Sequence, residues 1–176
     1  MQWREQRPDI IYIFSKDILR HRRAQKEDAV WLKKGEEYKD ETLSVRAFGS
    51  TDVGVSFLLQ AGGKKIFHAG DLNNWHWMDE STEAEWKGAE KNFLHELDDL
   101  YAYTPEVDVA MFPVDPRLGK EYMRGAGQFV TKIKTHIFVP MHFTPEYAKQ
   151  VLSATFAEAH GVRFVSLTHA DKIEIE

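Results

Sequence analysis

The stretch VSFLLQAGGKKIFHAGD, residues 55–71, constrains the fold of this chain more than any other part of the sequence. Two apolar runs flank Gly62 and Gly63, and consecutive glycines are typical of the tight turn of a β-hairpin. The second run ends at Gly70 and Asp71 and is followed by the residues LNNWHW. We therefore expect two antiparallel strands, with polar and aromatic residues crowded into the loop beyond the second strand.

Apolar runs and turn residues divide the rest of the sequence into strands and helices. Runs typical of strands occupy residues 9–15, 30–33, 42–48, 107–114, 135–143, 162–169 and 172–176. Sequence patterns predict helices over residues 16–29, between Thr82 and Pro105, and over 125–134 and 145–161. The first run is continuously apolar, which is typical of a strand covered on both faces. Strands joined by hairpins come first and strands separated by helices follow, so we expect an α/β fold with a mixed sheet.

Composition indicates a single globular domain spanning residues 1–176. Hydrophobic residues make up 43% of the chain and charged residues 29%, which suits a sizeable buried core. The formal net charge of −5 argues against a role on nucleic acids or membrane surfaces, both of which favour basic faces. One basic run, residues 20–26, is short and precedes Glu27 and Asp28, so we interpret it as a solvated turn or helix end.

The sequence lacks long apolar segments and cysteine, which limits the expected cellular location and the possible metal ligands. No stretch approaches the roughly 18 apolar residues of a membrane-spanning helix, and residues 1–9 lack the apolar core of a secretion signal. We therefore expect a cytoplasmic protein. The sequence contains no cysteine, which excludes disulfides and thiolate ligands. A metal ion would have to be bound by nitrogen and oxygen ligands.

Polar residues follow several of the expected strands, where α/β folds commonly place their sites. The strand ends concerned cover residues 49–54, 68–77, 112–119 and 140–143. Asp71 and His142 each come directly after an apolar run, and Asp52 and Asp115 are placed in a similar way. One such residue is common in a turn or a core, but their joint occurrence indicates a metal site with oxygen and nitrogen ligands.

The hairpin sequence, followed much later by IFVPMHF, resembles the C-terminal half of a metallo-β-lactamase-fold hydrolase. It is most similar to the branch of metal-dependent hydrolases that includes ascorbate-6-phosphate lactonase. In that family an aspartate after glycine bridges two metal ions, and a final histidine in a Pro-x-His context binds the second metal. Asp71 after Gly70 and His142 in PMHF match these motifs. Over residues 8–175 the resemblance implies an αββα sandwich of mixed sheets flanked by helices, with a divalent metal such as zinc or manganese.

The sequence departs from the family pattern in two places. The leading motif of the family, His-x-His-x-Asp-His, supplies most ligands of the first metal and is not found in this sequence, so we expect an incomplete sandwich whose front is missing. The family also places a histidine in the loop that corresponds to GSTDVG, residues 49–54. Asp52 is a candidate oxygen ligand there, which would favour a harder ion than zinc. The alternative is that Asp52 only shapes the turn before Gly54.

The aromatic loop after Asp71 leaves several roles open. His68 is expected to support the site rather than bind a metal. His76 is a candidate catalytic donor to a substrate carbonyl or phosphate, with Trp75 or Trp77 forming a wall of the substrate pocket. The alternative is a loop fixed by two packed indoles, with His76 exposed.

The sequence VDPRLG places Asp115 and Arg117 on either side of Pro116, which limits the freedom of the backbone. Asp115 and Arg117 are candidate substrate-binding residues, and Arg117 is suited to a bidentate clamp on an anionic substrate. The alternative for Arg117 is an ion pair with Asp115 or Asp71 that holds the site together.

Taken with the resemblance, these residues predict metal-dependent hydrolysis, in which a metal-activated water attacks an ester, lactone or phosphoester. Asp71 would bridge the metal ions and orient the nucleophile, and His142 would bind the second ion. Because firm metal sites use three or four protein ligands, we expect this chain to be inactive alone. It would form a homodimer or associate with a missing N-terminal half. The alternative is a non-catalytic remnant that acts as a dimerising or binding module.

Overall fold

The computed structural model describes residues 3–20, 25–144, 154–165 and 175. Its centre is a seven-stranded mixed sheet with the order β3-β4-β5-β6-β7-β8-β9. The strands are β3 (Glu37–Lys39), β4 (Leu43–Phe48), β5 (Ser56–Ala61), β6 (Lys64–His68), β7 (Glu106–Pro113), β8 (Lys134–Met141) and β9 (Arg163–Phe164). The four strands from β3 to β6 pair antiparallel, and those from β6 to β9 pair parallel. The α/β fold with a mixed sheet flanked by helices is thereby confirmed.

The expected hairpin joins β5 to β6. Ala61 pairs with Lys64, so Gly62 and Gly63 form the two-residue turn. Both glycines have positive φ angles, of 56° and 77°, which is the backbone geometry that a tight hairpin turn requires. Beyond this hairpin the chain crosses through helix α2 into β7, which pairs parallel to β6.

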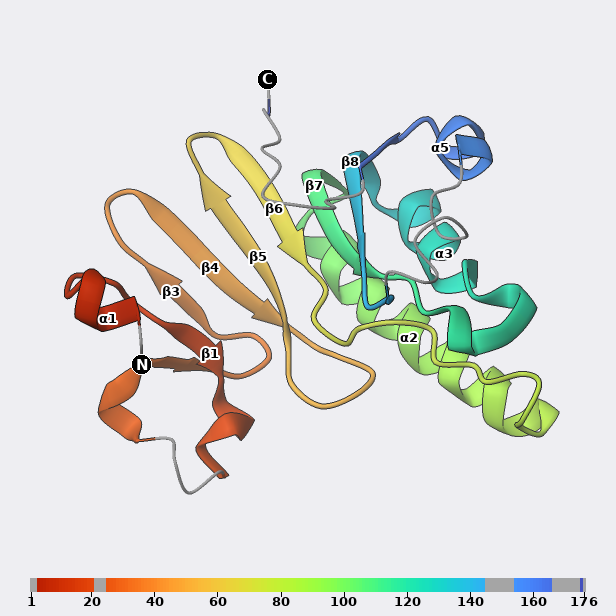
Figure 1. The fold of residues 1–176 in the computed structure, drawn as a ribbon, viewed down its shortest axis with the longest axis horizontal. Helices are drawn as coiled ribbons and strands as arrows, with labels where there is room; N and C mark the ends of the chain where they lie inside the picture. Colours follow the sequence, from red (N-terminus) through yellow and green to blue (C-terminus); the bar gives the residue numbers. More distant parts are fainter. Residues whose placement is uncertain (1–2, 21–24, 145–153, 166–174, 176) are drawn as a thin grey trace.

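Helix α2 (Glu83–Tyr103) and helix α3 (Arg124–Lys132) cover one face of the sheet (Figure 1). Thr82 caps α2 and forms a capping box with Glu85, which satisfies backbone N–H groups that the first turn leaves free. The main core consists of apolar side chains from this sheet face and both helices. Its largest fully buried members are Phe67, Phe93, Phe112, Phe129, Phe138, Leu58, Leu97 and Leu100. Fully burying each such side chain contributes on the order of 1.5–3 kcal/mol to folding.

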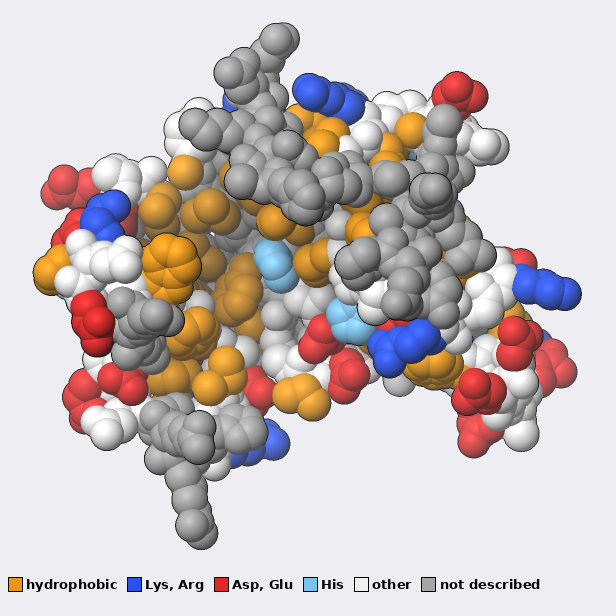
Figure 2. All heavy atoms as spheres, in the orientation of Figure 1, with side chains coloured by type: hydrophobic (Ala, Val, Ile, Leu, Met, Phe, Trp, Pro, Cys, Tyr) orange, Lys and Arg blue, Asp and Glu red, His pale blue; other side chains and the backbone are white. Residues whose placement is uncertain are grey.

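The other face of the sheet is covered in part by a small separate sheet. Strands β1 (Ile13–Ser15) and β2 (Val30–Leu32) pair parallel and contribute to an apolar cluster with β4 and β5. A second cluster on strands β7 and β8 contains Val109, Ile137 and Val139. In Figure 2, hydrophobic side chains gather over β4 and β5 on this face.

The N-terminal strand differs from the expectation of a strand covered on both faces. Only residues 13–15 of the apolar run 9–15 form a strand, and it pairs with β2 outside the main sheet. Ile11 is exposed and Ile13 is half-buried, because the run lies along the edge of the molecule rather than inside it. The predicted helix over 16–29 is replaced by 3₁₀ turns at Lys16–Arg20 and Lys26–Asp28, with residues 21–24 outside the described part.

The C-terminal region is described only in part. Helix α5 (Ala154–His160) lies within the helix expected over 145–161, and residues 145–153 fall outside the described chain. Strand β9 lies within the strand expected over 162–169, and residues 166–169 fall outside the described chain. Of the strand expected over 172–176 the structure describes Ile175 alone. A short helix, α1 (Trp3–Gln6), lies at the other end of the chain. Within the part that the structure describes, no helix is long and apolar enough to cross a membrane.

Candidate metal site at the strand ends

The carboxyl ends of β6, β7 and β8 meet at one edge of the sheet because the three strands are parallel and adjacent. Asp71, Asp115 and His142 follow these strands and come together at this edge. In Figure 2, histidine, acidic and basic side chains gather near the lower end of β8. The strand-end pattern in the sequence therefore corresponds to one cluster in space.

Asp71 and His142 form a facing pair. The Oδ1 atom of Asp71 lies 3.7 Å from Nε2 of His142, and their side chains are 47% and 36% exposed. His142 has a φ angle of 69°, a left-handed conformation that is uncommon outside glycine. Such backbone geometry is found most often where a site requires one side-chain direction, and here it directs the imidazole toward Asp71.

Asp115 lies behind His142 and is almost completely buried, at 1% exposure. Its Oδ2 atom is 3.0 Å from Nδ1 of His142. Arg117 donates to both carboxylate oxygens, from Nε at 2.9 and 3.0 Å and from Nη2 at 2.5 Å. Burial acts to raise the pKa of Asp115, but the hydrogen bonds and charge of Arg117, aided by His142, outweigh it and lower that pKa below its ordinary value.

The contact with Asp115 bears on which nitrogen of a neutral His142 ring carries the hydrogen. A carboxylate only accepts hydrogen bonds, so Nδ1 of His142 carries the hydrogen that Asp115 receives. In the neutral ring Nε2 then has a free lone pair, and that lone pair faces Asp71. An imidazole with a carboxylate behind it and a free nitrogen toward a second carboxylate fits a divalent cation. Asp71 and His142 would hold the ion, and Asp115 would hold His142.

The loop after β6 is shaped by a close backbone contact. Gly70 has a φ angle of 57°, and a Cβ atom at this position would lie 2.9 Å from the backbone oxygen of Val55. Only glycine allows both this conformation and this approach. The turn at Gly70 carries the chain from β6 to Asp71 at the edge of the sheet.

The two tryptophans of this loop pack beside the pair. Trp75 donates from its indole nitrogen to the backbone oxygen of Asp71 at 2.8 Å, and its ring meets the ring of His142 edge-on at 5.4 Å. Trp77 stacks on Trp75 with ring centroids 6.4 Å apart, and the guanidinium of Arg117 lies 6.0 Å from the Trp77 ring. These contacts hold the two indoles in one place beside the facing pair.

A cavity of about 360 Å³ opens next to the pair. It is lined by Asp115, Pro116, Arg117, His142, Phe143 and Thr144. Arg117 lies at its rim with a side chain that is 62% exposed. Arg117 thus forms the predicted ion pair with Asp115. It also remains accessible from the cavity.

His68 lies near the pair, and its Nδ1 atom is committed to the backbone. Its Nδ1 atom accepts a hydrogen bond from the backbone N–H of Gly70 at 3.0 Å, so Nε2 carries the hydrogen in the neutral ring. Desolvation lowers the pKa of His68, although the charge of Asp71 acts in the opposite direction. In this tautomer neither nitrogen offers a free lone pair to a metal ion, in keeping with a supporting role.

The structure does not bring His76 to the pair. The side chain is buried at 1% exposure, its Nε2 atom lies 3.2 Å from the backbone oxygen of Glu121, and its Nδ1 atom accepts from the N–H of Met78 at 3.2 Å. His76 is therefore neither exposed nor placed at the pair, as its two predicted roles required. His76 is held inside by backbone groups that require its two nitrogens.

Asp52 lies in the loop between β4 and β5, at the same edge of the sheet but away from the pair. It lines a separate cavity of about 330 Å³ with Ser50, Thr51, Asn92, His95 and Glu96. Its carboxylate accepts a hydrogen bond from the N–H of Val53 at 2.8 Å, as in a turn. Among the described residues, no group of three or more histidines and acids is placed to hold a metal ion.

Sequence reasoning missed the polar network that anchors the loop after β6. Asn74 donates to Gln128 at 2.9 Å and to Glu90 at 3.3 Å. Glu90 also accepts from Arg124 at 2.7 Å and from Gln128 at 2.5 Å. The network ties the loop to α2 and α3. The adjacent asparagines in LNNW could have predicted such a network, because amide side chains that are buried in an aromatic loop need hydrogen-bond partners.

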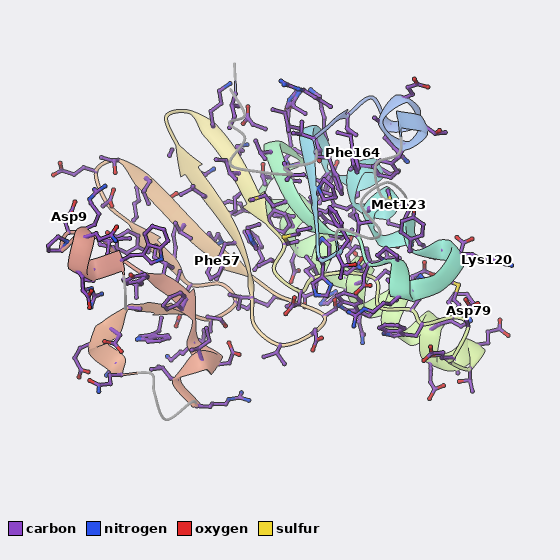
Figure 3. All side chains as sticks on the ribbon, in the orientation of Figure 1. Asp9, Phe57, Asp79, Lys120, Met123 and Phe164 are labelled. Carbon is purple, nitrogen blue, oxygen red and sulfur yellow. The ribbon has the colours of Figure 1, made fainter. Side chains whose placement is uncertain are left out.

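A second anchor lies further along the same loop. Asp79 lies against Gly119 of the 3₁₀ helix Pro116–Glu121, where a Cβ atom would meet Oδ2 of Asp79. Figure 3 shows Asp79 and Lys120 at the same end of the molecule. The loop after β6 is thus packed against the segment after β7.

Comparison with known proteins gives matches at the level of structure. No protein-family model and no curated protein sequence matches the chain. CmlA, a diiron β-hydroxylase from Streptomyces venezuelae, aligns with 80% of this chain at 12% identity and a TM-score of 0.50, and its E377D mutant does so with a TM-score of 0.52. These alignments cover 32–33% of CmlA. At this identity the match shows a shared fold.

A second solved structure is described as a putative zinc-dependent hydrolase of the metallo-β-lactamase superfamily, from Thermotoga maritima. It has 18% identity and a TM-score of 0.44, over 73% of this chain and 58% of the other. The chain thus spans less than two thirds of the length of these structures.

Proposed function

We propose that this chain carries part of a metal-dependent hydrolase site of the metallo-β-lactamase type, in the branch similar to ascorbate-6-phosphate lactonase. The observation that carries the proposal is the facing pair, in which Oδ1 of Asp71 and Nε2 of His142 lie 3.7 Å apart. Their placement at the ends of β6 and β8 supports it, as does the resemblance of the two sequence motifs. CmlA, with which the chain shares a fold, is described as a diiron enzyme.

Asp71 and His142 would have different roles at the metal ion. Asp71 would bridge and orient, and His142 would bind, a divalent ion such as zinc or manganese. When bound, such an ion lowers the pKa of a coordinated water and polarises an ester, lactone or phosphoester. Trp75 would exclude water from one side. Arg117, at the rim of the adjacent cavity, would attract an anionic substrate through the part of its guanidinium that Asp115 leaves open.

We further propose that the chain alone is catalytically incompetent. Two protein ligands seldom hold a metal firmly enough for catalysis, and the described residues supply two. Additional ligands would come from a second polypeptide or a second copy of this chain. We also propose a cytoplasmic location, in keeping with the absence of cysteine.

A second candidate function is a non-catalytic binding module. It is favoured by the absence, among residues 3–20, 25–144, 154–165 and 175, of any three-residue group of histidines and acids suited to a metal ion. In this case the buried Asp115 and its partners would maintain a fold whose chemistry is no longer used.

Zinc and manganese titrations of the full chain by calorimetry test the proposal. We expect binding of one ion, weakened at least about tenfold, or about 1.4 kcal/mol, by Asp71→Ala or His142→Ala. Asp52→Ala is the matched control and is expected to leave affinity unchanged. Wild-type affinity in both variants would refute the site, and undetectable metal binding by the wild-type chain would favour the binding module. Hydrolysis of lactone or phosphoester probes by the chain alone would refute the proposed incompetence.

A further inference from the structure

The buried carboxylate of Asp115 accepts hydrogen bonds from Arg117 and contacts His142, which follows a neighbouring strand. We infer that Asp115 is a positioning residue: with Arg117 it fixes His142 in the tautomer whose Nε2 lone pair faces Asp71. The effect of this positioning on metal binding rests on the proposed function. The tautomer itself is a property of the metal-free protein.

The backbone holds the segments that carry Asp115 and His142 side by side. Pro113 of β7 pairs with Met141 of β8, and the N–H of Val114 donates to the backbone oxygen of Met141 at 2.9 Å. His142 follows Met141 directly, and Asp115 lies two residues after Pro113. Backbone hydrogen bonds therefore keep these two strand ends adjacent, within reach of the contact between the carboxylate and the imidazole.

Asp115 cannot easily turn away from His142. Its Oδ1 atom accepts from the backbone N–H of Arg117 at 3.0 Å and so caps the 3₁₀ helix that begins at Pro116. Burial at 1% leaves no solvent to replace these partners. The carboxylate is therefore held by a cap, an arginine and a histidine, all of which act as donors.

Arg117 makes the arrangement specific for a carboxylate. Its Nε and Nη2 atoms occupy both oxygens of Asp115, and the guanidinium stays charged at every relevant pH. If an asparagine replaced Asp115, its single oxygen would be taken by the cap and by Nε of Arg117 at the Oδ1 position. Its NH₂ group would then face Nη2 of Arg117, which would lose its acceptor, and Nδ1 of His142, which would have to accept rather than donate.

Asp115→Asn is therefore expected to reverse the tautomer of His142. The hydrogen would move to Nε2, the lone pair toward Asp71 would be lost, and Nε2 would become a donor to Asp71. The variant retains size and the backbone cap, so a purely structural role for Asp115 would leave the ring in its original tautomer. This difference separates positioning from mere packing.

Long-range ¹H–¹⁵N correlation spectra of the metal-free protein test the inference directly. The His142 signals would be assigned with His142→Gln. We expect hydrogen on Nδ1 in the wild-type chain and on Nε2 in Asp115→Asn. The matched control is Asp40→Asn, because Asp40 also accepts backbone N–H groups, from Thr42 at 2.8 Å and Leu43 at 3.0 Å, in the turn between β3 and β4. It is expected to keep the wild-type tautomer.

Zinc titration of the same proteins provides the second readout. Loss of a carboxylate behind a ligating histidine typically weakens metal binding 10–100-fold, and we expect a loss of about that size for Asp115→Asn and none for Asp40→Asn. Hydrogen on Nε2 of His142 in the wild-type chain would overturn the inference, whether or not Asp115→Asn folds. An unchanged tautomer in a folded Asp115→Asn would also overturn it. The expected tautomers without zinc binding by the wild-type chain would support the positioning and refute a metal site formed by this chain alone.

Discussion

The indole nitrogen of Trp75 donates a hydrogen bond to the backbone oxygen of Asp71 at 2.8 Å. The tryptophan thereby closes the loop that presents Asp71, and the same ring packs edge-on against His142. One side chain therefore contacts both members of the facing pair. The aromatic character of the loop is explained by this double contact.

Trp75→Phe separates the two contacts. Phenylalanine retains an aromatic edge beside His142 but loses the donor to Asp71, so we expect a loss of about 0.5–1.5 kcal/mol in the free energy of unfolding. We also expect weaker zinc binding, because Asp71 would be less firmly placed. Urea unfolding and calorimetry measure the two effects. Trp31→Phe is the control, because Trp31 makes a similar bond to Lys26 at 2.9 Å away from the site. Equal zinc affinities in both variants would contradict the role given to Trp75.

Gly70→Ala is expected to lower stability by about 1–3 kcal/mol. The substitution combines a positive φ angle with a Cβ atom placed 2.9 Å from the backbone oxygen of Val55. Gly35→Ala separates these two costs, since Gly35 has a φ angle of 88° and nothing within 4 Å of an added Cβ atom. Thermal unfolding of both variants provides the comparison. A loss in Gly70→Ala no larger than that in Gly35→Ala would show that the loop moves away from Val55 at little cost.

His76→Ala is expected to destabilise the fold by about 2–4 kcal/mol without changing the zinc affinity of the remaining folded protein. The substitution leaves a cavity and two backbone groups, of Glu121 and Met78, without their partner. His136→Ala, at an exposed histidine paired with Glu106, serves as the control and is expected to cost less than about 0.5 kcal/mol. Weaker zinc binding with unchanged stability would instead place His76 in the chemistry.

The contribution of Glu90 to the free energy of unfolding is expected to decrease at acid pH. The hydrogen bond from Arg124 is the main cause that lowers the pKa of Glu90; desolvation opposes it, and Gln128 adds to the lowering. A carboxylate whose pKa is lower in the folded state stabilises the fold above its unfolded pKa, near 4.5, and loses this contribution as pH falls through the folded pKa. We therefore expect Glu90→Gln to cost about 1 kcal/mol at pH 7 and less at pH 3.

Urea unfolding of Glu90→Gln and the wild-type chain at pH 7, 5, 4 and 3 measures this convergence. Glu83→Gln is the control, because Glu83 lies exposed at the start of the same helix and pairs only with Lys87 among the described residues. A constant difference between wild type and Glu90→Gln across this range would show that charge on Glu90 does not stabilise the loop.

The sequence alone determined the hairpin, the mixed sheet and the positions of Asp71 and His142 at strand ends. Each of these depends on local patterns, namely paired glycines, apolar runs and the residues that follow them. The long helix α2 was also predictable, because Thr82 and Glu85 form its cap and its apolar positions recur at helical spacing. The early apolar run at residues 9–15 was misleading, since continuous apolar character does not reveal whether a strand lies inside a sheet or at its margin.

Only the tertiary structure decided what these residues face. The lateral order of β6, β7 and β8 places Asp115 behind His142 and turns Nε2 of His142 toward Asp71. It also buries His76 against Glu121 and directs Asp52 toward a different cavity. The physical reason is that side-chain periodicity records which face of an element is apolar, whereas contacts across strands depend on pairing and register between distant segments. A histidine beside an indole has the same local sequence whether it is buried or exposed.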